Sequence, residues 1–107
     1  MSKRILFMGT PDYATTILKE LLQSNYELVG LFTQPDKPVG RKQLLTAPHI
    51  KQYCLDSNLD IPIFQPLKLR GNEEAKKQIE DLKPDFIIVA AYGQILPKQI
   101  LDIAPCI

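Results

Sequence analysis

The chain offers few side chains that could transfer a proton near neutral pH. His49 is the only histidine in the sequence, so it is the one ordinary candidate for a general base. It stands within a basic segment, and no nucleophile or acidic partner lies near it in the sequence. This setting favours a surface or phosphate-contacting role for His49 over catalysis. We therefore assign no catalytic residue from the residue types alone.

Positive charge is concentrated between residues 37 and 51, where no acidic residue follows Asp36. The groups that can carry it are Lys37, Arg41, Lys42, His49 and Lys51. Charge alone is typical of a solvated, mobile loop. The same segment also contains restricted, flexible and apolar positions, namely Pro35, Pro38, Gly40, Leu44 and Leu45. Because this mixture suits phosphate contacts combined with an apolar wedge, we expect an RNA-binding loop, with the solvated loop as the alternative.

The stretch GTPDYA at residues 9–14 follows a short apolar segment, where a dinucleotide-binding fold carries its glycine-rich turn. Pro11, which lacks an amide hydrogen, stands in place of the second glycine, and Ala14 stands in place of the third. The sequence therefore argues against a nicotinamide dinucleotide. Gly9 either lets a ligand approach the backbone or makes a tight turn, and the pattern leaves both readings open.

The stretch AYGQILP at residues 91–97 leaves an apolar strand at the edge where open parallel sheets bind ligands. Its backbone groups, flanked by Ile95 and Leu96, could hold a flat heteroaromatic ring, but the same two side chains could equally fill the core.

Cys54 and Cys106 form no paired ligand motif, so we expect no metal, and Cys54 has the setting of an ordinary core thiol.

Alternating strands and amphipathic helices are expected to position these segments. The apolar periods predict strands at residues 4–8, 28–33, 61–66 and 86–92, and helices at 11–25, 46–58, 72–83 and 98–103. Thr10 is the predicted N-cap of the first helix and Asn72 that of the third. The continuous apolar run at 86–92 predicts a central strand covered on both faces. Together these elements predict an open, doubly wound, mostly parallel α/β sheet.

Composition sets only broad limits on function. The 107 residues are 45% hydrophobic, which is enough for one small domain or part of one. The 13 basic and 12 acidic residues nearly cancel, so net charge indicates neither a nucleic-acid nor a membrane partner. The apolar run Ile5–Gly9 is too short for a signal peptide or a membrane span, and we expect a cytoplasmic protein.

Four stretches together resemble the methionyl-tRNA formyltransferase family in order and spacing, over nearly the whole chain. They are FMGTPDYA at 7–14, FTQPDKPVGR at 32–41, FQPLKLR at 64–70 and VAAYGQILP at 89–97. The basic second stretch is similar to the tRNA enzyme specifically, rather than to the relatives that act on glycinamide ribonucleotide or nucleotide sugars. The resemblance implies a Rossmann-like formyltransferase fold. It also implies transfer of a formyl group from 10-formyltetrahydrofolate to the α-amine of methionine on the initiator tRNA.

The resemblance further implies roles for particular residues. The loop at 36–48 would enter the acceptor arm of the tRNA, using Lys37, Arg41, Lys42, Leu44 and Leu45. Part of the wall of the folate pocket would be formed by Tyr92, Gly93, Gln94, Ile95 and Leu96. The amino-acceptor side would be bordered by Gly9, Thr10 and Pro11.

The family's catalytic asparagine, histidine and aspartate are expected beyond residue 107. On that expectation, residues 1–107 are the amino-terminal part of the catalytic domain, without its carboxyl-terminal half or the tRNA-binding C-terminal domain, and inactive alone. No obligate protein partner is evident. The alternatives are a non-catalytic RNA-binding or ligand-binding module of the same fold, and a formyltransferase for another amine.

Overall fold

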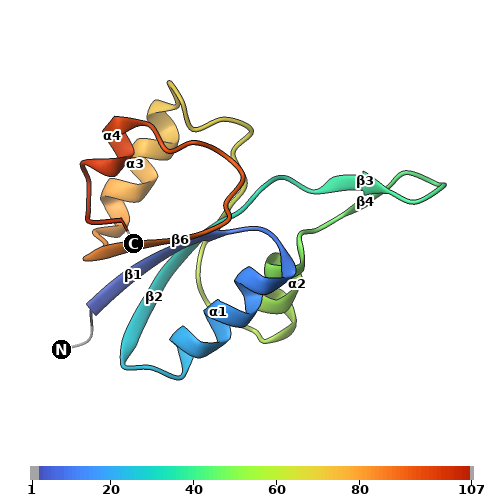
Figure 1. The fold of residues 1–107 in the computed structure, drawn as a ribbon, viewed down its shortest axis with the longest axis horizontal. Coiled ribbons are helices and arrows are strands. Elements are labelled where there is room, and N and C mark those ends of the chain that lie inside the picture. Colours follow the sequence, from blue (N-terminus) through green and yellow to red (C-terminus); the bar gives the residue numbers. More distant parts are fainter. Residues whose placement is uncertain (1–2, 107) are drawn as a thin grey trace.

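The computed structural model describes residues 3–106, which form three layers with a parallel sheet between two pairs of helices (Figure 1). The sheet has the strand order β5-β2-β1-β6. Its strands are β1 (Lys3–Gly9), β2 (Tyr26–Phe32), β5 (Ile63–Phe64) and β6 (Phe86–Ala90). The helices are α1 (Asp12–Leu22), α2 (His49–Asp56), α3 (Glu73–Leu82) and α4 (Lys98–Leu101). The predicted open, mostly parallel α/β arrangement is confirmed.

Alternate side chains of β1 supply two separate cores, one on each face of the sheet. Phe7 packs with side chains of α1 and α2, whereas Leu6 and Met8 pack with side chains of α3 and α4. All three are fully buried, and each contributes roughly 1.5–3 kcal/mol of transfer free energy. β1 therefore holds both helical layers in place relative to the loops that follow the carboxyl ends of β1, β2 and β6.

The two predicted N-caps have different outcomes. Asn72 does cap α3, because its side-chain oxygen accepts a hydrogen bond from the amide of Ala75 at 2.9 Å. The prediction for Thr10 is wrong, since Pro11 occupies the N-cap position of α1 and no side chain caps that helix. The hydroxyl of Thr10 instead donates to the carbonyl of Tyr92, which lies 82 residues along the chain.

The prediction that residues 86–92 form a central strand stays a prediction, because residues 3–106 place β6 (Phe86–Ala90) at one side of the sheet and its second neighbour was expected beyond residue 107. The strand β1 lies between β2 and β6, whereas β6 pairs with β1 alone along its length. On the other side of β6, residues 3–106 supply a single parallel bridge between Ile87 and Cys106. An apolar run reports that both faces of a strand are covered, which α1 and α3 achieve, but it does not report how the strand's edges are paired.

The segment between β2 and α2 contains an antiparallel hairpin where no strand was predicted. Its strands are β3 (Lys37–Val39) and β4 (Leu44–Thr46), which pair Val39 with Leu44. Left-handed backbone at Gly40 (φ 75°) and Gln43 (φ 50°) closes the turn. Strands of three residues are too short to show alternation, and Pro38 cannot donate to the ladder. The hairpin projects away from the sheet and the helices (Figure 1).

Candidate functional site

The carboxyl ends of β1, β2 and β6 meet at one edge of the sheet, which is where open α/β folds bind ligands. Thr10, directly after β1, joins the loops at this edge. Its hydroxyl donates to the carbonyl of Tyr92 at 2.8 Å and accepts from the amide of Gln34 at 3.3 Å. The buried Thr33 hydroxyl donates to the same oxygen at 3.4 Å. Thr10 therefore holds three loops together.

Two glycines at this edge are needed for close packing. A Cβ on Gly9 would lie 2.8 Å from both the Cβ of Ala14 and the carbonyl oxygen of Ala90. Protein atoms, rather than open space, therefore surround that position. A Cβ on Gly93, where φ is 103°, would lie 2.5 Å from the side-chain nitrogen of Gln34. A larger residue at Gly9 would push β1 away from α1 and β6. A larger residue at Gly93 would displace the side chain of Gln34 and would be strained by the positive φ.

The five residues after β6 that were predicted to line a folate pocket fall into different environments. The side chain of Tyr92 is buried in the core beneath α3 and α4, and burial raises the pKa of its phenol to about 12. Its hydroxyl has no hydrogen-bond partner among residues 3–106. Leu96 is half-buried against the same core, whereas Ile95 is 92% exposed. Only Gln94 and Ile95 of this group line the neighbouring cavity.

That cavity has a volume of about 620 Å³ and lies between the loop after β6 and residues 67–70. Its apolar wall includes Leu67, Leu69 and Ile95. Three cationic side chains also line it: Lys68, Arg70 and Lys98. The size falls within the usual range for small-molecule sites, and the residues suit a flat apolar ring that carries anionic groups.

Gln94 holds the two walls of this cavity together. Its side-chain oxygen accepts from the amide of Leu69 at 3.0 Å. Its side-chain nitrogen lies 3.2 Å from the carbonyl of Leu67 and 3.1 Å from the side-chain oxygen of Gln34. An amide both donates and accepts, so one side chain can join three segments. The sequence assigned Gln94 to the pocket wall but gave no sign of this bridging role.

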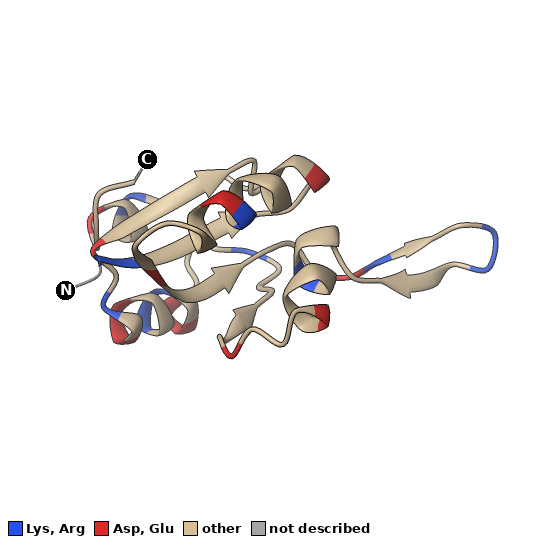
Figure 2. Ribbon diagram, turned by 90° about the horizontal axis from the view of Figure 1, so that it is seen from below, with Lys and Arg blue, Asp and Glu red and all other residues tan. Residues whose placement is uncertain are grey.

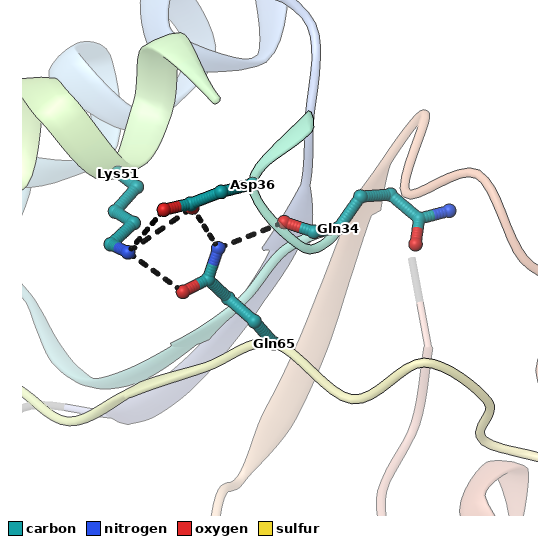
Figure 3. Close-up of polar contacts among 4 residues, drawn as sticks. All are labelled: Gln34, Asp36, Lys51 and Gln65. Carbon is teal, nitrogen blue, oxygen red and sulfur yellow. Dashed lines mark hydrogen bonds and ion pairs between the residues drawn. The ribbon is translucent and has the colours of Figure 1, made fainter. Parts of the chain in front are cut away.

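A second polar cluster, which we name the hairpin clamp, consists of Asp36, Lys51 and Gln65 (Figure 3). The ammonium of Lys51 donates to the carboxylate of Asp36 at 3.2 Å and to the side-chain oxygen of Gln65 at 2.8 Å. The side-chain nitrogen of Gln65 donates to Asp36 at 2.7 Å and to the carbonyl of Gln34 at 3.1 Å. Hydrogen bonds from Gln65 and then Lys51 hold the pKa of Asp36 below its usual value. Lys51 is thus paired, although the sequence grouped it with the loop cations.

The residues predicted to contact RNA lie on the hairpin. The exposed members are Lys37, Arg41, Lys42, Leu44 and Leu45. Figure 2 shows the basic residues of the turn at the far end of the hairpin. Within the described part of the chain neither Arg41 nor Lys42 forms an ion pair. The hairpin therefore presents cations and apolar side chains to the surroundings.

A smaller cleft, of about 180 Å³, joins the base of the hairpin to the end of β1. Thr10, Lys37 and Val39 are among its lining residues. The structure thus brings one residue predicted for the amino-acceptor side next to one predicted for RNA contact. Pro11, at the N-cap of α1, is half-buried and lines neither this cleft nor the larger cavity.

The remaining polar candidates have structural positions. The ring nitrogen Nδ1 of His49 lies 2.9 Å from the hydroxyl of the buried Thr15, and His49 itself is exposed. Cys54 is on the buried face of α2, and burial raises the pKa of its thiol to about 11. Within residues 3–106 no group of three or more histidine, cysteine or acidic side chains could hold a metal ion. Nor does this part of the chain contain a helix that is long and apolar enough to span a membrane.

Comparison with known proteins covers nearly the whole chain. The family described as Formyl transferase matches residues 3–106. The chain is 65% identical over 104 residues to the methionyl-tRNA formyltransferase of a Nitratiruptor species. It is 61% identical over 106 residues to that of Campylobacter fetus subsp. fetus and 59% over 104 residues to that of Campylobacter hominis. These alignments include 97–98% of this chain but 34% of each relative, so the chain spans about a third of the length of these relatives. The chain belongs to the formyl transferase family.

Proposed function

We propose that these residues form the tRNA-contacting hairpin and part of the formyl-donor pocket of a methionyl-tRNA formyltransferase. The observation that carries the proposal is the placement of an exposed basic hairpin and a cavity at the same edge of the sheet. The relatives' names support this assignment, because all three are methionyl-tRNA formyltransferases. The proposed reaction moves a formyl group from 10-formyltetrahydrofolate to the α-amine of methionine on the initiator tRNA.

The larger cavity is the proposed site for the folate donor. Its apolar wall, which includes Leu69 and Ile95, suits the flat ring system, and its three cations suit the carboxylates of the folate. Gln94 would keep the two walls at the correct spacing through its hydrogen bonds to both. Tyr92, Gly93 and Leu96 would contribute by shaping the loop from below rather than by side-chain contact.

The hairpin is the proposed tRNA contact. Arg41 and Lys42 at its turn would bind phosphates or bases, Lys37 would do so at its base, and the exposed side chains of Leu44 and Leu45 would pack on the end of the acceptor stem. The small cleft then continues from the hairpin toward Thr10. This arrangement supports the assignment of Thr10 to the side of the site that faces the amino acceptor. Gly9 and Pro11 line neither cavity, and we propose that they shape the turn that carries Thr10.

The reaction also needs groups that manage the proton of the amine and stabilise the formyl oxygen. The amine nitrogen bonds to the formyl carbon and loses a proton, while the bond from that carbon to the folate nitrogen breaks and the folate nitrogen gains a proton. Hydrogen-bond donors must stabilise the charge that develops on the formyl oxygen. Within residues 3–106 the only histidine is engaged with Thr15 and lines neither cavity. We propose that the catalytic side chains lie outside these residues.

The test is an acceptor comparison with the protein at its natural length and with 10-formyltetrahydrofolate as donor. Methionyl-tRNA, glycinamide ribonucleotide and an amino nucleotide sugar are offered separately, and formylated product is measured. We expect transfer to methionyl-tRNA alone. Preferred transfer to either small amine would refute the tRNA assignment. Binding of tRNA without transfer to any acceptor would favour a non-catalytic module.

A further inference from the structure

We infer that the hairpin clamp positions the hairpin for tRNA, by fixing the direction in which β3 and β4 leave the sheet. Asp36, Lys51 and Gln65 are positioning residues on this view, not residues that touch the tRNA. The inference rests on the proposed function, because it concerns the substrate that the hairpin would bind. It gives Asp36, Lys51 and Gln65 a positioning role that neither the sequence pattern nor the family resemblance had given them.

The hairpin needs such a device because burial does not hold it in place. All six residues of β3 and β4 are exposed, so neither strand has a buried side chain to anchor it on the body of the protein. A two-stranded ribbon without a packed face is only marginally ordered by its own ladder. The direction of the hairpin must therefore be set where its two ends join the fold.

The clamp lies at that junction and joins both ends of the hairpin. Asp36 directly precedes β3, while Lys51 lies on α2, the helix that follows β4. Their ion pair therefore ties the incoming segment to the outgoing one, and Gln65 ties both to the end of β5 (Figure 3). The two charged side chains are only 34% and 21% exposed, so this pair is more ordered than a fully solvated one.

Gln65 has a role that a carboxylate could not take. Its nitrogen donates to Asp36 and to the carbonyl of Gln34, while its oxygen accepts from Lys51. Glutamate is nearly the same size but has no donor at neutral pH, and it would place a second negative charge beside Asp36. Gln65→Glu therefore disrupts the clamp while adding almost no bulk.

The same network reaches the larger cavity. The carbonyl of Gln34 accepts from Gln65, and the side-chain oxygen of Gln34 accepts from Gln94 in the cavity wall. The hairpin base and the cavity wall are thus joined through one residue by hydrogen bonds. The clamp would set the direction of the hairpin relative to the cavity before the tRNA binds, so that less ordering is needed upon binding.

The experiment compares Gln65→Glu with a matched control in the protein at its natural length. The control is Gln52→Glu on the exposed face of α2, where Gln52 donates to Asp56 at 2.9 Å, so it also creates a carboxylate beside an aspartate. We expect Gln65→Glu to raise KM for methionyl-tRNA about tenfold, because a loosened binding segment must be ordered upon binding. We expect kcat and KM for 10-formyltetrahydrofolate to stay within about twofold, and Gln52→Glu to match the parent.

Two further readouts separate positioning from direct contact and from general destabilisation. The salt dependence of tRNA binding should keep its slope in Lys51→Met, since the clamp makes no phosphate contact. Lys51→Arg, which keeps the charge, should recover most of the affinity that Lys51→Met loses. Amide hydrogen exchange over residues 37–46 should be faster in Gln65→Glu than in the parent or in Gln52→Glu.

The outcomes distinguish this inference from the proposed function. A parent protein that does not formylate methionyl-tRNA refutes the proposed function, while hydrogen exchange still tests the clamp without any activity. A parent that is active, with unchanged KM and unchanged exchange in Gln65→Glu, overturns the clamp. A salt slope reduced in Lys51→Met also overturns it, because Lys51 would then contact phosphate itself. If Gln65→Glu does not fold, the two Lys51 variants decide.

Discussion

Tyr92 is a buried phenol beneath the loop that borders the larger cavity. The hydroxyl is fully buried and has no hydrogen-bond partner among residues 3–106, although most buried hydroxyls have one. Burial raises its pKa from 10.0 to about 12, because the low-dielectric core disfavours the phenolate. Because the folded state holds the phenolic proton more tightly than the unfolded chain does, the protonated phenol favours the fold relative to the ionised one. That stabilisation is complete below pH 10 and is lost as the pH rises toward 12.

Tyr92→Phe removes this hydroxyl and its titration. At neutral pH we expect the free energy of unfolding to stay the same or to rise by up to about 1 kcal/mol, because an unsatisfied buried hydroxyl is lost. Above pH 10 the variant should lose less stability than the parent. Urea unfolding at pH 7.5, 10 and 11 measures both effects. A loss of more than about 1 kcal/mol at neutral pH would contradict the account, since it would reveal a partner for the hydroxyl.

Individual residues also show which contacts a sequence can predict. The cap formed by Asn72 joins residues three apart, so the local pattern was sufficient to predict it. The hydroxyl of Thr10 bonds to a carbonyl 82 residues away, and local chemistry predicted a helix cap there instead. The choice between the two is made by the sheet, which brings the ends of β1 and β6 together. The role of Thr10 therefore could not be predicted without the fold.

The helices and strands also divide into those that the sequence predicted and those that it missed. Helices α1 to α3 each bury one face, and strands β1, β2 and β6 are covered on both faces. Apolar periods and continuous apolar runs therefore predicted all six. The strands β3 and β4 bury none of their residues, and their pairing was missed for that reason. The hairpin clamp was missed because its members come from three elements. Its Lys51 looked like one more free cation until the fold placed Asp36 and Gln65 beside it.

The loop after β6 gives an element-scale prediction. Ile95 is almost fully exposed on the cavity wall, so Ile95→Asp should leave folding intact. We expect KM for 10-formyltetrahydrofolate to rise about five- to tenfold, from the loss of one apolar contact. KM for methionyl-tRNA should not change. Leu55→Asp is the matched control, because Leu55 is an exposed apolar residue of α2 that lines neither cavity. Equal effects of the two variants would argue against a donor site here.

At the scale of all the described residues, the basic turn of the hairpin lies away from the sheet and its two cores (Figure 2). The net charge of these 107 residues is only +1, so together they create no strong overall field. The described residues extend 46 × 34 × 20 Å, and the hairpin lies along the longest of these axes (Figure 1). The cations of the hairpin turn thus lie far from the helices, where acidic and basic residues are mixed (Figure 2). Attraction for RNA in this account is a local property of the hairpin.

The salt dependence of methionyl-tRNA binding tests this central claim most directly. The variant is Arg41→Ala with Lys42→Ala, and the control is Lys76→Ala with Lys77→Ala on α3, which removes equal charge in another layer. For the protein at its natural length, the account predicts weaker tRNA binding by the hairpin variant. Its slope of log Kd against log salt should be smaller by about one unit for each lost phosphate contact. The control should keep the parent slope. An unchanged slope in the hairpin variant, or an equal change in the control, would contradict the account.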